Sequence, residues 1–287
     1  MSIVFLFVSA LCWTFFDFAR KKLVASETPL ALTVAFNVGA IPLYCLAFFL
    51  SAEPSSLTLV SDISDLNLSY WIPSFVAAGL AALAAVGFIT ALKLGDIARV
   101  IPVLALTPVI STLAAGWLLG ESLNLSQWLA MSVTVIAIAG AQGGLHHVRG
   151  KPFLLMLLVC LGWGTGIVFD KQALSHSGPF FHGIVQTILG SLLLLAYALV
   201  SSTSVRVQSG VLRLLPALVV FVAAVVFQWF ALSGLDAGIV ETVKRSVGII
   251  GALLGGLLLF KEAITKSQVL WCLVILACIP VILQPEV

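Results

Sequence analysis

The sequence contains little charge. Only 9% of its 287 residues are Asp, Glu, Lys or Arg, against about 25% in an average soluble domain. The net charge is +2 and no basic run is longer than Arg20-Lys21-Lys22, so we expect no nucleic acid partner. Hydrophobic residues make up 61% of the chain and the mean hydropathy is +1.18. This composition predicts an integral membrane protein that crosses the lipid bilayer several times.

The sequence also lacks the common motifs of disulfide frameworks, metal sites and enzymes. Its five cysteines all fall inside apolar segments without a C-x-x-C spacing, and His146-His147 beside Arg149 is typical of a polar linker. There is no nucleotide-binding loop, His-Glu-x-x-His, pair of intramembrane aspartates or Gly-x-Ser-x-Gly. We therefore expect no cofactor, no metal and no enzymatic activity. The first apolar run ends in basic residues without a small-residue cleavage site, which favours a retained membrane span over a signal peptide.

Hydropathy divides the chain into ten apolar spans, and a helix needs about 20 residues to cross the bilayer. Most connections are a few residues long, so neighbouring helices should be antiparallel. The longest connection, residues 51–69, is acidic and rich in serine, and no separate soluble domain fits. The expected spans are residues 3–23, 29–50, 70–92, 97–119, 125–142, 152–174, 179–200, 214–234, 237–259 and 267–284.

An internal repeat relates residues 1–145 to residues 146–287. The matched residues keep their order: Trp13 with Trp163, Lys21 with Lys171 and Pro29 with Pro179 at a shift of 150, Asp96 with Asp236 and Gly116 with Gly256 at 140, and Glu121 with Glu262 at 141. Each half holds five spans, and this odd number gives the second copy the opposite orientation, as in many transporters. The sequence thus predicts an all-α membrane protein of ten transmembrane helices in two inverted five-helix repeats.

Two small-x-x-x-small patterns occur in related spans, Gly116 to Gly120 and Gly251 to Gly255. Such patterns let helix backbones approach closely. We favour packing within the chain over a homodimer face, and both a monomer and a homodimer remain open.

Three charged residues stand in the first half of the ninth span: Glu241, Lys244 and Arg245. Their i,i+3 and i,i+4 spacing places them on one helix face, and each cation at bilayer depth costs roughly 2.5–3.5 kcal/mol on insertion scales. We expect this face to line a substrate pathway, with Lys244 and Arg245 binding a carboxylate or phosphate. The alternative is that both cations reach toward the interface. Glu241 would hold Arg245 in place, bind an amine or take a proton. We favour the first of these roles, a structural pairing with Arg245.

Other polar and aromatic residues inside the spans have two readings. Asp17 precedes Arg20 and Lys21 at helical spacing, which favours a salt-bridged helix end over a proton-coupling carboxylate. The related Trp13 and Trp163 either line the substrate cavity or pack in the core.

Further residues inside the spans can hydrogen-bond between helices or bend a helix. Pro102 and Pro108 would bend the fourth span and serve as flexing points for gating. We expect His182, Gln186 and Gln228 to form hydrogen bonds between helices.

The order of the spans, the Trp-to-Lys spacing of spans one and six, and the Leu-Leu-Gly-Glu121 and Leu-Phe-Lys-Glu262 sequences resemble the drug/metabolite transporter superfamily, EamA-type branch. This resemblance implies a substrate cavity between the halves near mid-membrane, with spans four and nine among its walls. The Lys244-Arg245 pair is similar to a dyad of triose-phosphate and related sugar-phosphate translocators, where it contacts the substrate phosphate. The chain departs from that pattern at Glu241, whose charge would partly cancel the attraction for an anion.

The combined interpretation is a secondary transporter that moves a small polar metabolite with a carboxylate or phosphate across the membrane by alternating access. The alternatives are an exporter of amino acids or amphipathic drugs with proton coupling, and an intramembrane lipid-phosphate enzyme.

Loop charges predict the orientation in a cell (inner) membrane. Ten Lys and Arg residues fall in loops on one side, against Lys171 alone on the other. The positive-inside rule then places both termini outside the cytoplasm, whereas the family resemblance implies cytoplasmic termini.

Overall fold

The computed structural model describes residues 1–24, 27–51, 66–94, 101–141, 150–208, 210–260 and 264–284, and every regular element in these ranges is helical. The first half holds α1 (Ser2–Val24), α2 (Pro29–Ser51), α4 (Leu68–Leu94), the 3-10 helix η1 (Ile101–Leu106), α6 (Thr107–Leu119) and α7 (Leu125–Ala141). The second half holds α8 (Lys151–Leu174), α9 (Pro179–Val200), α10 (Val211–Leu232), α11 (Ala237–Phe260) and α12 (Lys266–Ile282). These helices match the ten predicted spans, so the predicted fold class is confirmed. The expected boundary between the halves, at residues 145 and 146, lies outside the described ranges.

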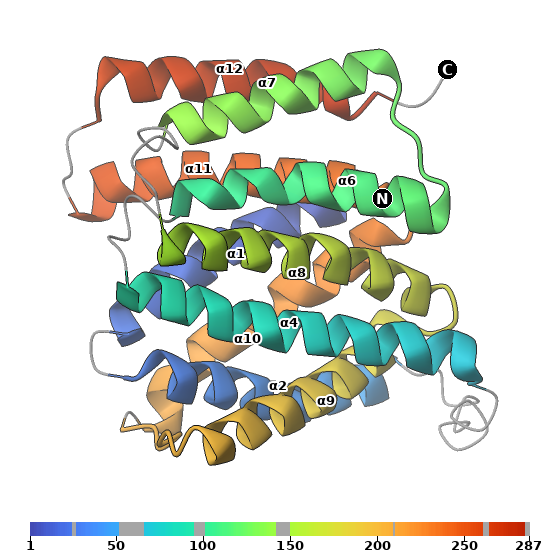
Figure 1. Ribbon diagram of the computed structural model, residues 1–287, viewed down its shortest axis with the longest axis vertical. Helices are drawn as coiled ribbons and strands as arrows, with labels where there is room; N and C mark the ends of the chain where they lie inside the picture. The colour runs from blue at the N-terminus through green and yellow to red at the C-terminus, as the bar shows by residue number, and fades with distance from the viewer. Residues whose placement is uncertain are drawn as a thin grey trace.

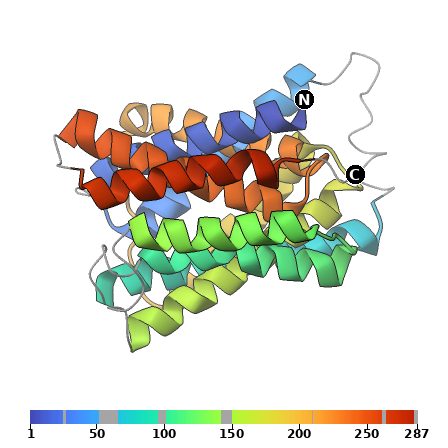
Figure 2. The ribbon, with the colours of Figure 1, turned by 90° about the horizontal axis from the view of Figure 1, so that it is seen from above.

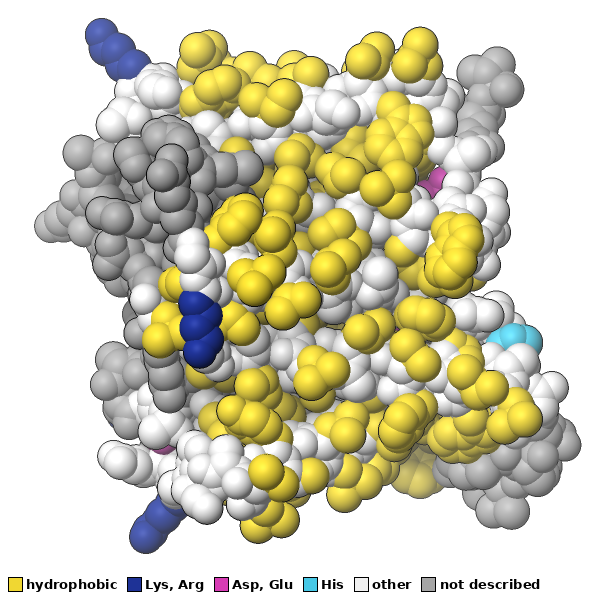
Figure 3. Space-filling view, viewed as in Figure 1, with side chains coloured by type: hydrophobic (Ala, Val, Ile, Leu, Met, Phe, Trp, Pro, Cys, Tyr) yellow, Lys and Arg dark blue, Asp and Glu magenta, His cyan; other side chains and the backbone are white. Residues whose placement is uncertain are grey.

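The helices are those of a membrane protein. Within the described ranges, six helices are long and apolar enough to cross a bilayer: α1, α2, α4, α8, α9 and α10. The η1–α6 segment, α7 and α12 form shorter apolar helices. Figure 3 shows apolar side chains across one face of the molecule, with Lys and Arg side chains at its left edge, where helices end. An apolar belt between charged ends is what a bilayer requires of a spanning protein.

The two halves interlock through helices related by the repeat. In Figure 1 the related helices are stacked in pairs, from α7 with α12 at the top to α2 with α9 at the bottom. Seen from above, α12 and α7 lie next to each other on the outside of the molecule (Figure 2). In the centre the partners cross over, because α1 packs against α10 and α11 whereas α8 packs against α4 and α6. The core is therefore built mostly from contacts between the two halves.

The fourth span differs from the continuous helix that the sequence predicts. Residues 95–100 lie outside the described ranges, the backbone from Ile101 to Leu106 is 3-10 helical, and the α-helix begins at Thr107. Pro108 lies in the first turn of α6, where its missing N–H costs nothing. Pro108 thus starts a helix rather than bending one. The gating role of Pro102 and Pro108 stays a prediction.

The two small-x-x-x-small patterns serve different purposes. A Cβ on Gly251 or Gly255 would collide with Thr14 or Phe18 of α1, so this pair brings α11 close to α1, as the sequence predicts. Gly120 instead ends α6 in the left-handed conformation, with φ of 71° and its N–H bonded to the carbonyl of Ala115. The first pattern is therefore a helix cap rather than a helix-packing pair, because only glycine adopts this φ without strain.

Candidate functional site

The charged residues of α11 lie inside the helix bundle. The side chains of Glu241, Lys244 and Arg245 are 3%, 13% and 24% exposed. Lys244 is paired with Glu241, and Arg245 Nε lies 3.5 Å from Oε2 of Glu241. One carboxylate thus faces two cations, and the three groups, called the charged trio below, carry a net charge of +1.

Close packing of α11 against α6 holds the charged trio in the interior. Gly238 lies one turn before Glu241, and a Cβ at this position would collide with Thr112 of α6. Val240 and Val243 on the same stretch of α11 are fully buried. The absence of a side chain at Gly238 therefore lets the two related helices touch at the depth of the charged trio.

Gln228 of α10 connects the charged trio to α1. Its Oε1 atom accepts hydrogen bonds from Lys244 Nζ at 2.9 Å and from Trp13 Nε1 at 3.0 Å. A buried amide oxygen has two lone pairs, and both donors use them here. The sequence predicts a hydrogen-bonding role for Gln228 but does not connect it to Lys244.

The two repeat-related tryptophans lie against different cations of the same helix. Lys244 Nζ is 5.8 Å from the ring centroid of Trp13, and Arg245 Cζ is 5.9 Å from that of Trp163. Both distances are within the range of cation–π attraction. The structure thus brings Trp13, Trp163 and the charged trio together in one site, contributed by α1, α8 and α11.

The site is symmetric in its aromatic residues and asymmetric in its charges. A shift of 140 residues places Lys244 and Arg245 on Leu104 and Ala105, and Gln228 on Phe88. Phe88 contacts Trp163 with ring centroids 5.3 Å apart, whereas Gln228 bonds to Trp13. The second half therefore supplies the polar groups, and the first half supplies apolar side chains at the equivalent positions.

Two atoms of the charged trio are buried without a hydrogen-bond partner among the described residues: Oε2 of Glu241 and Nε of Arg245. A buried polar atom that lacks a hydrogen bond costs about 1–3 kcal/mol, and more when it is charged. These two atoms lie 3.5 Å from each other, so Glu241 and Arg245 form an ion pair without a hydrogen bond between these atoms.

Asp17 is exposed, unlike the side chains of the charged trio. Its carboxylate bonds to Arg20 at 2.9 Å, and its side chain is 58% exposed. Arg20 also lies over the rings of Phe16 and Phe88, at 5.7 and 5.5 Å from their centroids. A role of Asp17 in proton coupling stays a prediction.

A second cluster of charges, which sequence reasoning missed as a unit, joins the two halves at the ends of their helices. Lys171 at the end of α8 pairs with Glu121, lies 3.7 Å from Asp236, and donates a 2.8 Å hydrogen bond to the carbonyl of Leu235. Glu121 Oε2 accepts the N–H of Ala237, the first residue of α11, at 2.9 Å. We call Glu121, Lys171 and Asp236 the end clamp. The repeat singles out all three residues, but only the tertiary structure brings them together.

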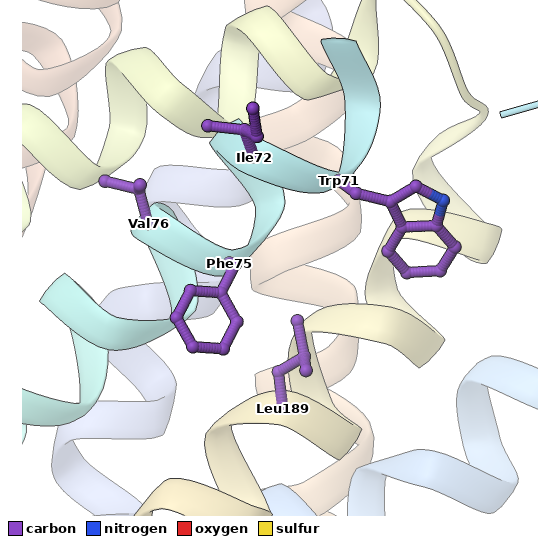
Figure 4. Close-up of a pocket in the computed structure, with 5 residues that line it drawn as sticks. All are labelled: Trp71, Ile72, Phe75, Val76 and Leu189. Atoms are coloured by element: carbon purple, nitrogen blue, oxygen red, sulfur yellow. The ribbon is translucent and has the colours of Figure 1, made fainter. Parts of the chain in front are cut away.

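A pocket on the outer surface is separate from both clusters. It lies between α4 and α9, has a volume of about 360 Å³, and is lined by Trp71, Ile72, Phe75, Val76 and Leu189 (Figure 4). Ile72 and Phe75 are more than half exposed, so this pocket is an apolar groove on the surface that faces lipid. The central substrate cavity stays a prediction.

Metal binding has no support in the described ranges, where no group of three or more His, Cys, Asp or Glu side chains could hold an ion. His146 and His147 lie outside these ranges.

Two interlocked five-helix repeats around a charged interior define a membrane transporter fold. The model of the EamA-like transporter family matches residues 1–141 and 150–284. The chain therefore belongs to the EamA-like transporter family, a branch of the drug/metabolite transporter superfamily whose members are transporters rather than enzymes.

Solved structures share the fold. A total of 29 chains match, and one of them, titled "Crystal structure of protein", has a TM-score of 0.74 and 16% identity over 98% of this chain and 95% of the other. No curated protein matches the chain. The likeness at 16% identity concerns the fold alone.

Proposed function

We propose that this transporter moves small metabolites with a carboxylate or phosphate group, and that Lys244 and Arg245 bind this group. The observation that carries the proposal is the imbalance of the charged trio, in which two cations face one carboxylate inside the bundle. A bound anion would compensate the excess positive charge. Arg245 offers a planar fork for two acceptor oxygens, and Lys244 adds a compact charge.

The aromatic residues suit an organic substrate. Trp13 and Trp163 lie beside Lys244 and Arg245 respectively, and their apolar faces can cover the carbon skeleton while the cations hold the anionic group. A similar division between apolar walls and a few polar groups is usual in small-molecule sites.

Alternating access requires contacts between the halves that close one side of the protein at a time. The end clamp has this character, because Glu121 belongs to the first half and Lys171 and Asp236 belong to the second. We assign the end clamp the role of a closed gate at the C-terminal end of α8, the helix that begins at Lys151. Opening this gate would break the pairing of Lys171 and the cap of α11.

Amino acids form a second substrate class, favoured by one specific observation. Glu241 Oε2 lacks a hydrogen bond among the described residues and lies 3.5 Å from Arg245 Nε, so a substrate ammonium group would replace this pairing while Arg245 binds the carboxylate. Glu241 would then act as a binding group in addition to its pairing with Lys244.

Proteoliposome uptake tests the anion site with three radiolabelled probes: succinate, glycerol 3-phosphate and glutamate. We expect Lys244→Gln and Arg245→Gln each to reduce uptake of the transported probe at least about tenfold, because each removes one charge-assisted hydrogen bond of about 1.5–3 kcal/mol. Arg213→Gln is the control, since Arg213 lies at the exposed start of α10. Undiminished uptake in both site variants, with folding verified by thermal unfolding, would remove the anion site.

We also propose that the protein lies in the cell (inner) membrane with both termini outside the cytoplasm. Lys151, Arg213 and Lys266 lie at the N-terminal ends of α8, α10 and α12, and Arg206 lies in the connection that leads into α10, which supports a basic cytoplasmic face. Reporter fusions at the C-terminus, active either in the cytoplasm or outside it, distinguish the two orientations.

A further inference from the structure

A third polar group, whose residues belong to neither the charged trio nor the end clamp, joins three helices in the interior. His182 of α9 lies with Nε2 3.1 Å from Oδ1 of Asp170 on α8 and with Nδ1 3.3 Å from the hydroxyl of Tyr70 on α4. Trp229 of α10 covers the imidazole edge-on, with ring centroids 4.8 Å apart. Both ring nitrogens of a buried histidine are thus engaged.

The burial of the three side chains differs in a way that matters for proton access. The His182 side chain is fully buried, Tyr70 is fully buried, and the Asp170 side chain keeps 19% of its surface exposed. Asp170 is thus the only one of these three side chains that is not fully enclosed. An intramembrane histidine paired with a carboxylate is the arrangement that proton relays use.

The titratable and charged groups around the pair come from four helices. Asp170 and Lys171 belong to α8, Tyr70 to α4, and Tyr44 of α2 lies against Gly183 next to His182. Lys244 of α11 interacts electrostatically with Asp170, and α10 contributes only the uncharged Trp229. Asp170 is the sole carboxylate that these contacts bring to His182 among the described residues. The electrostatic partner of a proton on His182 is thus defined.

The hydrogen bonds are satisfied in both protonation states of the imidazole. A carboxylate only accepts, so Nε2–H donates to Asp170 in either state. In the neutral state Nδ1 accepts from the Tyr70 hydroxyl, and after protonation Nδ1–H donates to the Tyr70 oxygen, because a hydroxyl can do either. The added proton comes from water and is the one carried by Nδ1, Nε2 keeps the proton that it donates to Asp170, and Tyr70 keeps its own. Because the Asp170 carboxylate is already ionised, protonation of the imidazole adds the attraction of opposite charges to an existing hydrogen bond.

We propose that His182 and Asp170 form a proton-binding site that couples proton movement to transport. Asp170 is followed directly by Lys171 of the end clamp, so the last turns of α8 carry both the proton site and the gate. Protonation of His182 strengthens the hold of α9 on this part of α8, and proton release weakens it. The energy source of transport is then the proton gradient, an inference that rests on the proposed transport function.

The site is tested by nuclear magnetic resonance of the full chain in lipid nanodiscs, with histidine labelled by ¹³C and ¹⁵N. The chain has four histidines, and His182 is assigned by the signal missing from His182→Gln. We expect the ring ¹⁵N signals of His182 to change from a neutral tautomer to imidazolium in a series of spectra recorded from about pH 8 down to about pH 5. At a pH where the wild-type signal is half converted, Asp170→Asn should lower the charged-to-neutral ratio at least about threefold. His176→Gln is the control, because His176 is exposed at the end of α8.

The outcomes separate this proposal from the anion site. A His182 signal that stays neutral from pH 8 to 5, or one that is unchanged by Asp170→Asn, overturns the proton site even if the transported anion is found. If His182 titrates as expected, uptake of that probe driven by a pH gradient should fall at least about tenfold in His182→Gln, while exchange at equal pH persists. If His182 titrates and none of the anion probes is transported, the anion proposal fails and the proton site stands on its spectroscopic result.

Discussion

Gln228 of α10 accepts a hydrogen bond from Lys244 of α11, 2.9 Å from amide oxygen to ammonium nitrogen, in the interior of the bundle. The same oxygen accepts from Trp13 of α1. Lys244 is thereby directed toward Trp13, while its neighbour Arg245 lies against Trp163. The Gln228 amide thus directs Lys244 toward the first half of the protein, while the adjacent Arg245 lies against the second half.

Loss of the shared acceptor should weaken both folding and binding. We expect Gln228→Leu to lower the free energy of unfolding by about 1–2 kcal/mol, because the Trp13 indole and Lys244 lose their acceptor. Thermal unfolding measures the stability, and quenching of tryptophan fluorescence by the anion probe measures binding. Gln186→Leu is the matched control, since Gln186 bonds to the carbonyl of Ser74 at 2.9 Å. Similar anion binding by the two variants would contradict a role of Gln228 in the site.

The charged trio should behave as a coupled unit. Glu241→Gln leaves two cations inside the bundle without a counter-charge, and we expect it to cost about 3 kcal/mol of stability, as removal of one partner of a buried ion pair does. Glu241→Gln combined with Lys244→Gln should be less destabilised than the sum of the single changes, by about 1–3 kcal/mol. Denaturant unfolding of the four proteins of this cycle gives the coupling energy. Additive effects would show that the charges act independently.

Two glycines of α11 should respond differently to the same change. Gly238→Ala places a Cβ against Thr112 of α6, with the Thr112 Cα only 3.1 Å away, so we expect a loss of about 1–3 kcal/mol from overpacking. Gly248→Ala meets nothing within 4 Å and should be neutral or stabilise by up to about 1 kcal/mol through helix propensity. Melting temperatures in detergent compare the two. Equal melting temperatures would mean that α6 and α11 are not in close contact at this depth.

Breaking the end clamp should expose the start of α11. In Glu121→Ala and Lys171→Met, we expect the amides of residues 235–241 to exchange with deuterium at least about tenfold faster, because the cap on Ala237 or the pairing of Glu121 is lost. Mass spectrometry of peptic peptides measures the exchange. Ser233→Ala serves as the control, since the exposed Ser233 bonds only within its own turn. Unchanged exchange in both clamp variants would argue against a gate at this position.

The fold was largely predictable because a bilayer leaves few choices. Every backbone polar group inside lipid must be paired within its segment, so apolar runs of sufficient length become helices. The departure at residues 101–108 has a local cause, since Pro108 cannot continue a preceding α-helix but can begin one. The misread Gly116 to Gly120 pattern has a similar cause, because spacing alone does not distinguish a packing pair from a helix cap.

The candidate site was predictable only in part. Glu241, Lys244 and Arg245 are close in sequence, so helical spacing alone places them on one face. Gln228 lies on another helix than Lys244 and is 16 residues away from it in the sequence. Asp170 and Tyr70 also lie on other helices than His182, 12 and 112 residues away. Hydropathy and periodicity carry no information on which polar side chains of different helices meet.

The sequence by itself determined the number of spans, the inverted repeat and the family, because these depend on the order and polarity of residues along the chain. The tertiary structure alone decided that Trp13 lies against Lys244 and Trp163 against the adjacent Arg245. It also decided that Glu121 caps α11 and that His182 contacts Asp170. Each of these contacts depends on how helices from the two halves cross, and crossing is set by packing of complementary surfaces rather than by any local pattern.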